Sequence, residues 1–90
     1  MSETEKKIML EVVSPSEILF SGEVDSLVVN AAKGKMGVLH DHAPLAAVLK
    51  PGLIKFRVSG KEISYKTSDG FLEIGENRIR VIVESAEALK

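Results

Sequence analysis

The two histidines of this 90-residue chain flank an aspartate, in the order His40-Asp41-His42. Residues i and i+2 of an extended strand project to the same side, so both imidazoles would face one metal ion. A zinc site needs three or four ligands, and the chain has no cysteine to complete the set. The favoured interpretation of this triplet is therefore a surface turn before Ala43-Pro44, with a metal site as the alternative.

Other catalytic patterns are incomplete. Serine, histidine and aspartate are all present, but no Gly-x-Ser-x-Gly nucleophile elbow occurs. A phosphate-binding loop at Lys33-Gly34-Lys35 would need a glycine where Val29 stands and a serine or threonine where Met36 stands. These patterns therefore favour a protein with no catalytic residue, no resident metal and no cofactor, with a hydrolytic or metal-dependent enzyme left as an alternative.

The composition argues against nucleic acid as a partner. Twelve basic and thirteen acidic residues leave a net charge of -1, whereas a nucleic-acid binder would carry a basic surplus. Hydrophobic residues make up 44% and charged residues 28%, which is typical of one globular domain. The polar start contains no apolar stretch long enough for a signal peptide or a membrane span. We expect an intracellular protein that reaches any membrane through a partner.

The sequence predicts that these residues lie on or between β-strands. Apolar and polar residues alternate with a period of two along most of the chain, which predicts strands with one buried face. Turn residues interrupt the pattern at short intervals, as in sandwiches and barrels. The alternating or apolar runs lie at residues 8–12, 27–29, 54–58, 63–67 and 79–83.

Two hairpins and one helix candidate complete the pattern. Val58 and Ile63 flank a turn that contains Ser59-Gly60, and the strands at 71–74 and 79–81 flank a second turn. Residues 85–90 are the helix candidate, although this segment is too short to be stable alone.

Residues 43–49 form an almost unbroken apolar run, Ala-Pro-Leu-Ala-Ala-Val-Leu. Such a run is typical of a strand buried on both faces, or of a strand with one face on the core and the other on a partner. Small alanine side chains would let another backbone approach closely. We favour the partner interface.

An ordered series of segments resembles the amino-terminal domain of the epsilon subunit of bacterial F-type ATP synthase. The segments are residues 22–29, 37–39, 42–45, 49–52 and 68–73, with further likeness at 10–15 and 81–87. The resemblance covers roughly residues 8–87 and implies an all-β fold, a flattened sandwich of two antiparallel sheets with about ten short strands. It divides the chain into a flexible tail at 1–6, the domain at 7–87 and a tail at 88–90.

The resemblance also implies a function. Such a domain is a non-catalytic rotor part of the central stalk, which binds the gamma subunit and rests on the polar loops of the membrane c-ring. It couples proton flow to ATP synthesis at the cytoplasmic face of the bacterial inner membrane. The gamma contacts would fall on His42, Ala43, Leu45, Ala46, Ala47, Leu53, Ser68 and Phe71. The c-ring contacts would fall on Lys33, Lys35, His40 and Asp41.

The chain departs from the family pattern in several places. Lys35 stands where an acidic residue is usual, His40-Asp41 where Pro-Gly is usual, and Ser68-Asp69-Gly70 where Ser-Gly-Gly is usual. The first two changes alter charge and backbone stiffness where the c-ring contact is expected. The sequence ends at Lys90, where a helical hairpin begins in most members. We therefore expect no ATP site and no hairpin-type inhibition in these ninety residues.

Two rival classes remain open. A stand-alone small-ligand or carbohydrate-binding sandwich would need exposed aromatic rings, and the candidates are Phe20, Phe56, Tyr65 and Phe71. Phe56 and Tyr65 follow inward-facing patterns. A hydrolytic or metal-dependent enzyme is the other alternative.

Overall fold

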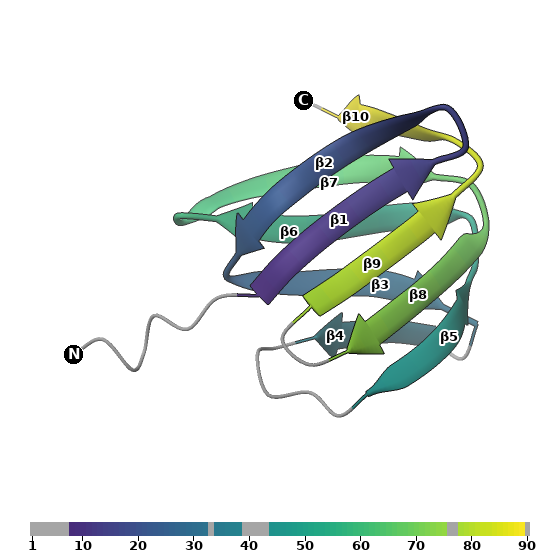
Figure 1. Ribbon diagram of the computed structural model, residues 1–90, viewed down its shortest axis with the longest axis horizontal. Coiled ribbons are helices and arrows are strands. Elements are labelled where there is room, and N and C mark those ends of the chain that lie inside the picture. Colours follow the sequence, from purple (N-terminus) through teal and green to yellow (C-terminus); the bar gives the residue numbers. More distant parts are fainter. Residues whose placement is uncertain (1–7, 33, 39–43, 76–77, 90) are drawn as a thin grey trace.

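The computed structural model describes residues 8–32, 34–38, 44–75 and 78–89, and these residues form ten β-strands (Figure 1). The prediction of an all-β fold with about ten short strands is confirmed. No described residue lies in a helix long and apolar enough to cross a membrane. The strands are β1 (Ile8–Ser14), β2 (Glu17–Val24), β3 (Ser26–Ala31), β4 (Gly34–Val38), β5 (Leu45–Leu49), β6 (Gly52–Val58), β7 (Lys61–Thr67), β8 (Gly70–Gly75), β9 (Arg78–Val83) and β10 (Ala86–Leu89).

The strands belong to one continuous sheet in the order β10-β7-β6-β3-β5-β8-β9-β1-β2, with β4 paired to β3 outside this path. A single residue pair, Ala31 with Leu49, joins β3 to β5. The sheet curls at this joint into a flattened, nearly closed barrel (Figure 1). The expected arrangement of two antiparallel sheets is not confirmed: the described strands form one sheet with two walls, because buried Ala31 and Leu49 continue the pairing around the corner. One neighbouring pair, β1 with β9, is parallel.

The core is built from alternate residues of each strand, as the period of two predicts. Phe56 lies at its centre, with its ring centroid 4.6 Å from that of Phe20 and 5.9 Å from that of Tyr65. The other core residues are aliphatic. They are Ile8, Leu10, Val12, Val24, Leu27, Val29, Ala31, Val38, Leu49, Ile54, Leu72, Ile74, Ile79, Val81 and Val83.

Both predicted hairpins are confirmed. Val58 pairs with Lys61, so Ser59 and Gly60 form a two-residue turn between β6 and β7. Their φ angles of 50° and 84° are both in the left-handed region, which matches the twist of the flanking strands. In the second hairpin Ile74 of β8 pairs with Ile79 of β9, and residues 76–77 of its turn lie outside the described part of the chain.

The helix candidate at residues 85–90 forms a strand instead: β10 runs from Ala86 to Leu89 and so includes most of the segment expected as a tail at 88–90. Strand β10 pairs with the edge of β7. This pairing gives hydrogen-bond partners to backbone N–H and C=O groups that would be unpaired in a helix of one or two turns. Ser68 directs the chain towards β7: its Oγ accepts hydrogen bonds from the backbone N–H groups of Glu84 (3.0 Å) and Ser85 (3.2 Å). The Ser68 N–H donates to the Ser85 carbonyl at 3.0 Å.

A β-bulge in β2 brings the two walls together. Val12 pairs with Phe20, but Val13 pairs with Ile18, so Leu19 is an extra residue opposite β1. The Leu19 carbonyl accepts a hydrogen bond of 3.2 Å from the Tyr65 hydroxyl of β7, on the opposite wall. The bulge also turns Ile18 to the outer face that Val13 occupies.

Candidate functional site

On the outer face of the wall formed by β5, β8, β9, β1 and β2, five hydrophobic residues, one on each strand, lie side by side. Each of these residues is the cross-strand partner of the next across the sheet, in the order Val48, Phe71, Ile82, Val13 and Ile18. We call this set the apolar row. Because neighbouring strands lie about 4.8 Å apart, the row is roughly 19 Å long. Phe71, Val48 and Ile18 are 58%, 54% and 64% exposed.

The row arises because the outward residues of β9 and β1 include charged residues and end with a hydrophobic residue. On β9 the outward residues are Arg78, Arg80 and then Ile82, while the residues between them are buried. On β1 they are Met9, Glu11 and then Val13. The parallel pairing of β1 with β9 places Val13 beside Ile82 and Glu11 beside Arg80, so apolar and charged residues form separate rows.

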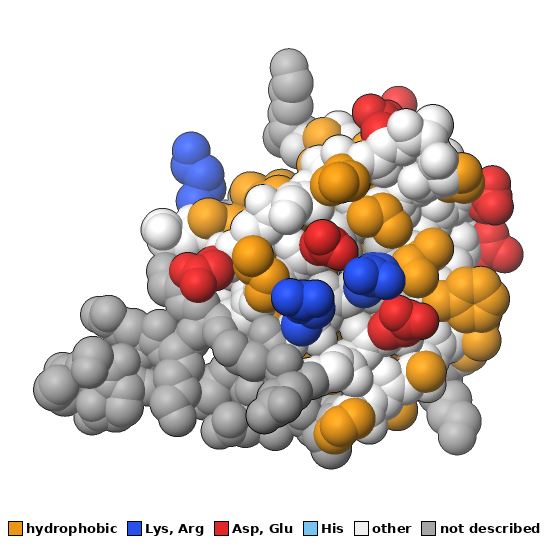
Figure 2. Space-filling view, viewed as in Figure 1, with side chains coloured by type: hydrophobic (Ala, Val, Ile, Leu, Met, Phe, Trp, Pro, Cys, Tyr) orange, Lys and Arg blue, Asp and Glu red, His pale blue; other side chains and the backbone are white. Residues whose placement is uncertain are grey.

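A charged row lies directly beside the apolar row. It runs from Glu73 of β8 through Arg80 to Glu11, and Ala46 of β5 continues it. Arg80 Nε lies 3.3 Å from Glu11 Oε1, with both side chains partly exposed. Figure 2 shows this face, with blue and red side chains near its middle and hydrophobic side chains gathered on the side where β9 ends. An exposed pair of this kind stabilises the fold by about 0.2–1 kcal/mol at most.

Two shallow hollows border the apolar row and share Val48, Phe71 and Ile82 in their linings. One has a volume of about 310 Å³ and reaches the ends of β1 and β9; the other has about 330 Å³ and lies over β5 and β8. The floor is largely hydrophobic. Exposed hydrophobic side chains in a continuous set mark a surface that binds another molecule, rather than a site for chemistry.

The residues expected to contact gamma do not all lie on the same face of the structure. Ala46 and Phe71 lie on the outer face with the apolar row, whereas Leu45 and Ala47 share the core side of β5 with buried Leu49. His42 and Ala43 lie outside the described residues.

Two further residues expected at the gamma contact lie elsewhere. Leu53, 45% exposed, points outward from β6, which β3 and β5 separate from β8 in the strand order. Ser68 is half-buried, and its hydroxyl is committed to the backbone connection between β9 and β10.

Of the residues expected at the c-ring, Lys35 is described. It is exposed on β4 opposite Asn30, and β4 pairs with β3 alone among the described strands. Lys33, His40 and Asp41 lie outside the described residues, as does the histidine triplet considered for a metal site. Elsewhere in the described part of the chain, no group of three or more His, Asp or Glu side chains is placed to hold a metal ion.

Sequence reasoning missed three residues of the apolar row, namely Ile82, Val13 and Ile18. Val48 lies within the run 43–49 that was favoured as an interface, but it was not singled out as a contact. The signal for Ile82 and Val13 was present: each is an apolar residue at a position whose neighbours two residues back, Arg80 and Glu11, are charged. Ile18 could not be found this way, because the bulge at Leu19 reverses its face.

The aromatic residues do not form a platform for sugars. Phe56 is buried, and Phe20 and Tyr65 are half-buried against it. Phe71 is thus the one strongly exposed ring, and stacking of a sugar chain generally uses more than a single ring.

A family model described as "ATP synthase, Delta/Epsilon chain, beta-sandwich domain" matches residues 7–89. The chain belongs to this family. The expected resemblance is therefore confirmed over most of the chain.

Curated relatives in this family are named "ATP synthase epsilon chain". The protein from Desulforamulus reducens is 38% identical over 78 residues, which cover 87% of this chain and 59% of the relative. That from Paramagnetospirillum magneticum is 42% identical over 82 residues, covering 90% of this chain and 62% of the relative. The chain thus spans about three-fifths of the length of these relatives.

Solved structures show the same fold. A chain of the Euglena gracilis mitochondrial ATP synthase (OSCP/F1/c-ring) superimposes with a TM-score of 0.86 at 22% identity, covering 91% of this chain and 53% of that chain. A chain of the Tetrahymena thermophila mitochondrial ATP synthase central stalk and c-ring gives a TM-score of 0.76 at 15% identity, covering 90% and 66%.

Proposed function

We propose that the chain is a non-catalytic part of the rotor of a proton-translocating ATP synthase, attached to the gamma subunit of the central stalk through the apolar row. It lies on the cytoplasmic side of the bacterial inner membrane as a peripheral part of the complex. The family membership supports this assignment, and the apolar row is the observation that carries the mode of attachment.

Burial of hydrophobic surface would stabilise this attachment. Three side chains of the apolar row are exposed and two, Val13 and Ile82, are half-buried. Covering them would contribute roughly 25 cal/mol per Å² of apolar surface removed from water. The centre of a stable interface is depleted in charge, and its rim is polar. The apolar row, with the charged row beside it, has this arrangement.

The second contact, with polar loops of the c-ring, is proposed for the side of the molecule where Lys35 lies. Lys35 is exposed on β4, and residues 33, 40 and 41 flank this strand in the sequence. A contact made by exposed charges would be more sensitive to salt than the apolar attachment.

The proposed job of the domain is mechanical. We infer that the curled sheet acts as a sandwich of two walls, because both walls pack on one core. Dense packing makes such a core resistant to compression and shear, which suits a part that moves with a rotor.

Phe71→Asp tests the attachment. This change places a charge within the row, between Val48 and Ile82, and we expect binding to purified gamma subunit to weaken by more than about tenfold, because the interface would bury an unpaired carboxylate. Isothermal titration calorimetry gives the affinity, and circular dichroism checks the fold, which 58% exposure of Phe71 should leave intact.

Val28→Asp is the matched control. Val28 is also an exposed hydrophobic residue, 39% exposed, but it lies on β3 of the other wall beside Lys55. Equal loss of gamma binding in both variants, or no loss in Phe71→Asp, would exclude the apolar row as the attachment site.

A further inference from the structure

We propose that Asp69 and Glu84 orient the partner on the apolar row, by binding a lysine or arginine that follows an apolar segment of that partner. This inference names the chemistry of the partner at the proposed attachment face and rests on that proposed function. We call these two residues the acidic rim.

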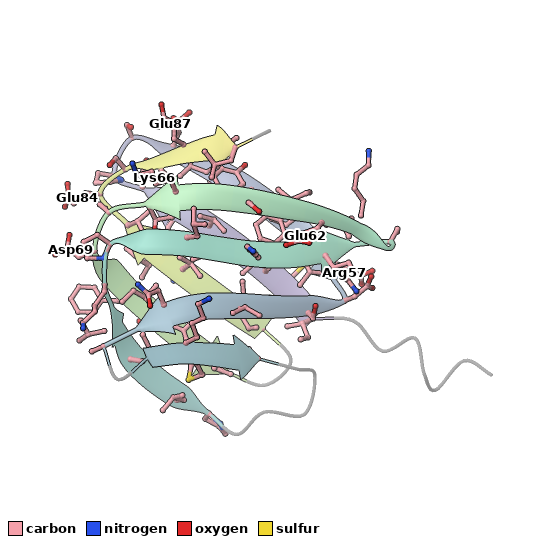
Figure 3. All side chains as sticks on the ribbon, turned by 180° about the vertical axis from the view of Figure 1, so that it is seen from behind. Arg57, Glu62, Lys66, Asp69, Glu84 and Glu87 are labelled. Atoms are coloured by element: carbon pink, nitrogen blue, oxygen red, sulfur yellow. The ribbon has the colours of Figure 1, made fainter. Side chains whose placement is uncertain are left out.

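The acidic rim and the apolar row belong to one hollow. Asp69 and Glu84 line the same hollow of about 310 Å³ as Val48, Phe71 and Ile82. Asp69 precedes β8 and Glu84 follows β9, so the two carboxylates stand at the end of two adjacent strands. Figure 3 shows both on one edge of the molecule, and Figure 2 shows acidic side chains at the right-hand edge beside hydrophobic ones.

One hydroxyl group fixes the backbone of both acidic residues. Ser68 Oγ donates a hydrogen bond of 2.9 Å to the Asp69 carbonyl oxygen and accepts one of 3.0 Å from the Glu84 N–H. Their side chains project from a connection that is held in place before any partner binds. A preorganised charge loses less conformational entropy on binding than a free one.

The rim carboxylates differ from Glu11 of the charged row. Glu11 is paired with Arg80, whereas the side chains of Asp69 and Glu84 have no hydrogen-bond or ion-pair partner among the described residues. Within the described part of the chain, no lysine or arginine lines their hollow. Two exposed carboxylates beside a hydrophobic floor are complementary to a segment that presents hydrophobic side chains and then a cation.

The test uses the isosteric double variant Asp69→Asn/Glu84→Gln and purified gamma subunit. We expect the dissociation constant to rise about tenfold at about 0.05 M salt and by less than about threefold at about 0.5 M, because salt screens charges that are exposed. The salt dependence of wild-type binding should be correspondingly steeper than that of the variant.

A matched control removes two carboxylates elsewhere. Glu23→Gln/Glu62→Gln causes the same change in net charge, but Glu23 lies on β2 beside Met9 and Glu62 lies on β7 beside Lys55. We expect less than about a twofold change in this control, because loss of net charge alone acts weakly at distances beyond the Debye length.

The outcomes are distinguishable. If wild-type protein binds gamma but the rim variant behaves like the control, the acidic rim has no role and the apolar attachment stands. If wild-type protein does not bind gamma, the proposed function fails, and this inference fails with it. If sedimentation shows that wild-type protein self-associates through a contact that the rim variant loses, the occupant is a second copy of the chain, and the partner assigned here is wrong.

Discussion

The two walls of the barrel share one core but differ in what they show to the outside. The wall of β5, β8, β9, β1 and β2 presents the apolar row, whereas the outward positions of β3, β6 and β7 are mainly polar or charged. Figure 3 shows this second wall, with Arg57, Glu62 and Lys66 on its surface. Both walls satisfy the same alternation of buried and exposed residues. Folding therefore constrains the inward positions of both walls in the same way, while the outward positions differ, and it is through outward positions of the first wall that we propose the attachment.

The largest expected effect comes from the core that both walls share. Phe56→Ala should lower the free energy of unfolding by about 3–5 kcal/mol, because it removes a fully buried ring that contacts Phe20 and Tyr65. Urea denaturation followed by circular dichroism measures this. Phe71→Ala is the comparison on the outer face and should cost less than about 1 kcal/mol, since 58% of Phe71 is already exposed. Similar losses in both variants would show that the division into core and outer face is wrong.

A smaller effect is expected from Ser68→Ala, which acts at the edge where the walls meet. The backbone N–H groups of Glu84 and Ser85 would lose their acceptor, at a cost of about 0.5–1.5 kcal/mol in the free energy of unfolding, because water can replace the acceptor at these exposed groups. Hydrogen exchange should show faster exchange at these two amides than in the wild type. Ser64→Ala on β7 is the control, and an identical exchange pattern in Ser68→Ala would contradict the assigned role.

The smallest effect compares the exposed ion pairs of the two walls. Glu11–Arg80 has a separation of 3.3 Å on one wall, and Lys55–Glu62 has 3.8 Å on the other. Double-mutant cycles with Gln and Ala replacements should give coupling energies of about 0.2–1 kcal/mol for each pair, declining with salt. A coupling energy above about 2 kcal/mol for either pair would show that these charges are structural rather than part of a solvated surface.

The inward half of the fold could be predicted from the sequence. Ile79, Val81 and Val83 alternate with charged or outward residues, and all three are buried. The hairpin at Ser59-Gly60 was predictable because its turn is local and uses a glycine at positive φ.

The outer face could be predicted only in part. Phe71 and Ala46 were identified, but the row depends on register between strands distant in the sequence, such as β1 with β9. Alternation within one strand also does not specify which apolar residue of a continuous run points inward. Ala47, assigned to the interface in the run 43–49, packs on the core, while its neighbour Val48 points outward.

The parallel pairing of β1 with β9 has a consequence for the synthesis of the protein. Strand β1 has one neighbour, β2, that follows it directly in the sequence, but its other neighbour, β9, is synthesised much later: Glu11 and Arg80 are 69 positions apart. During translation, β1 therefore stays unpaired along the edge that later binds β9. Contacts between such distant residues also slow spontaneous refolding relative to proteins with mainly local contacts.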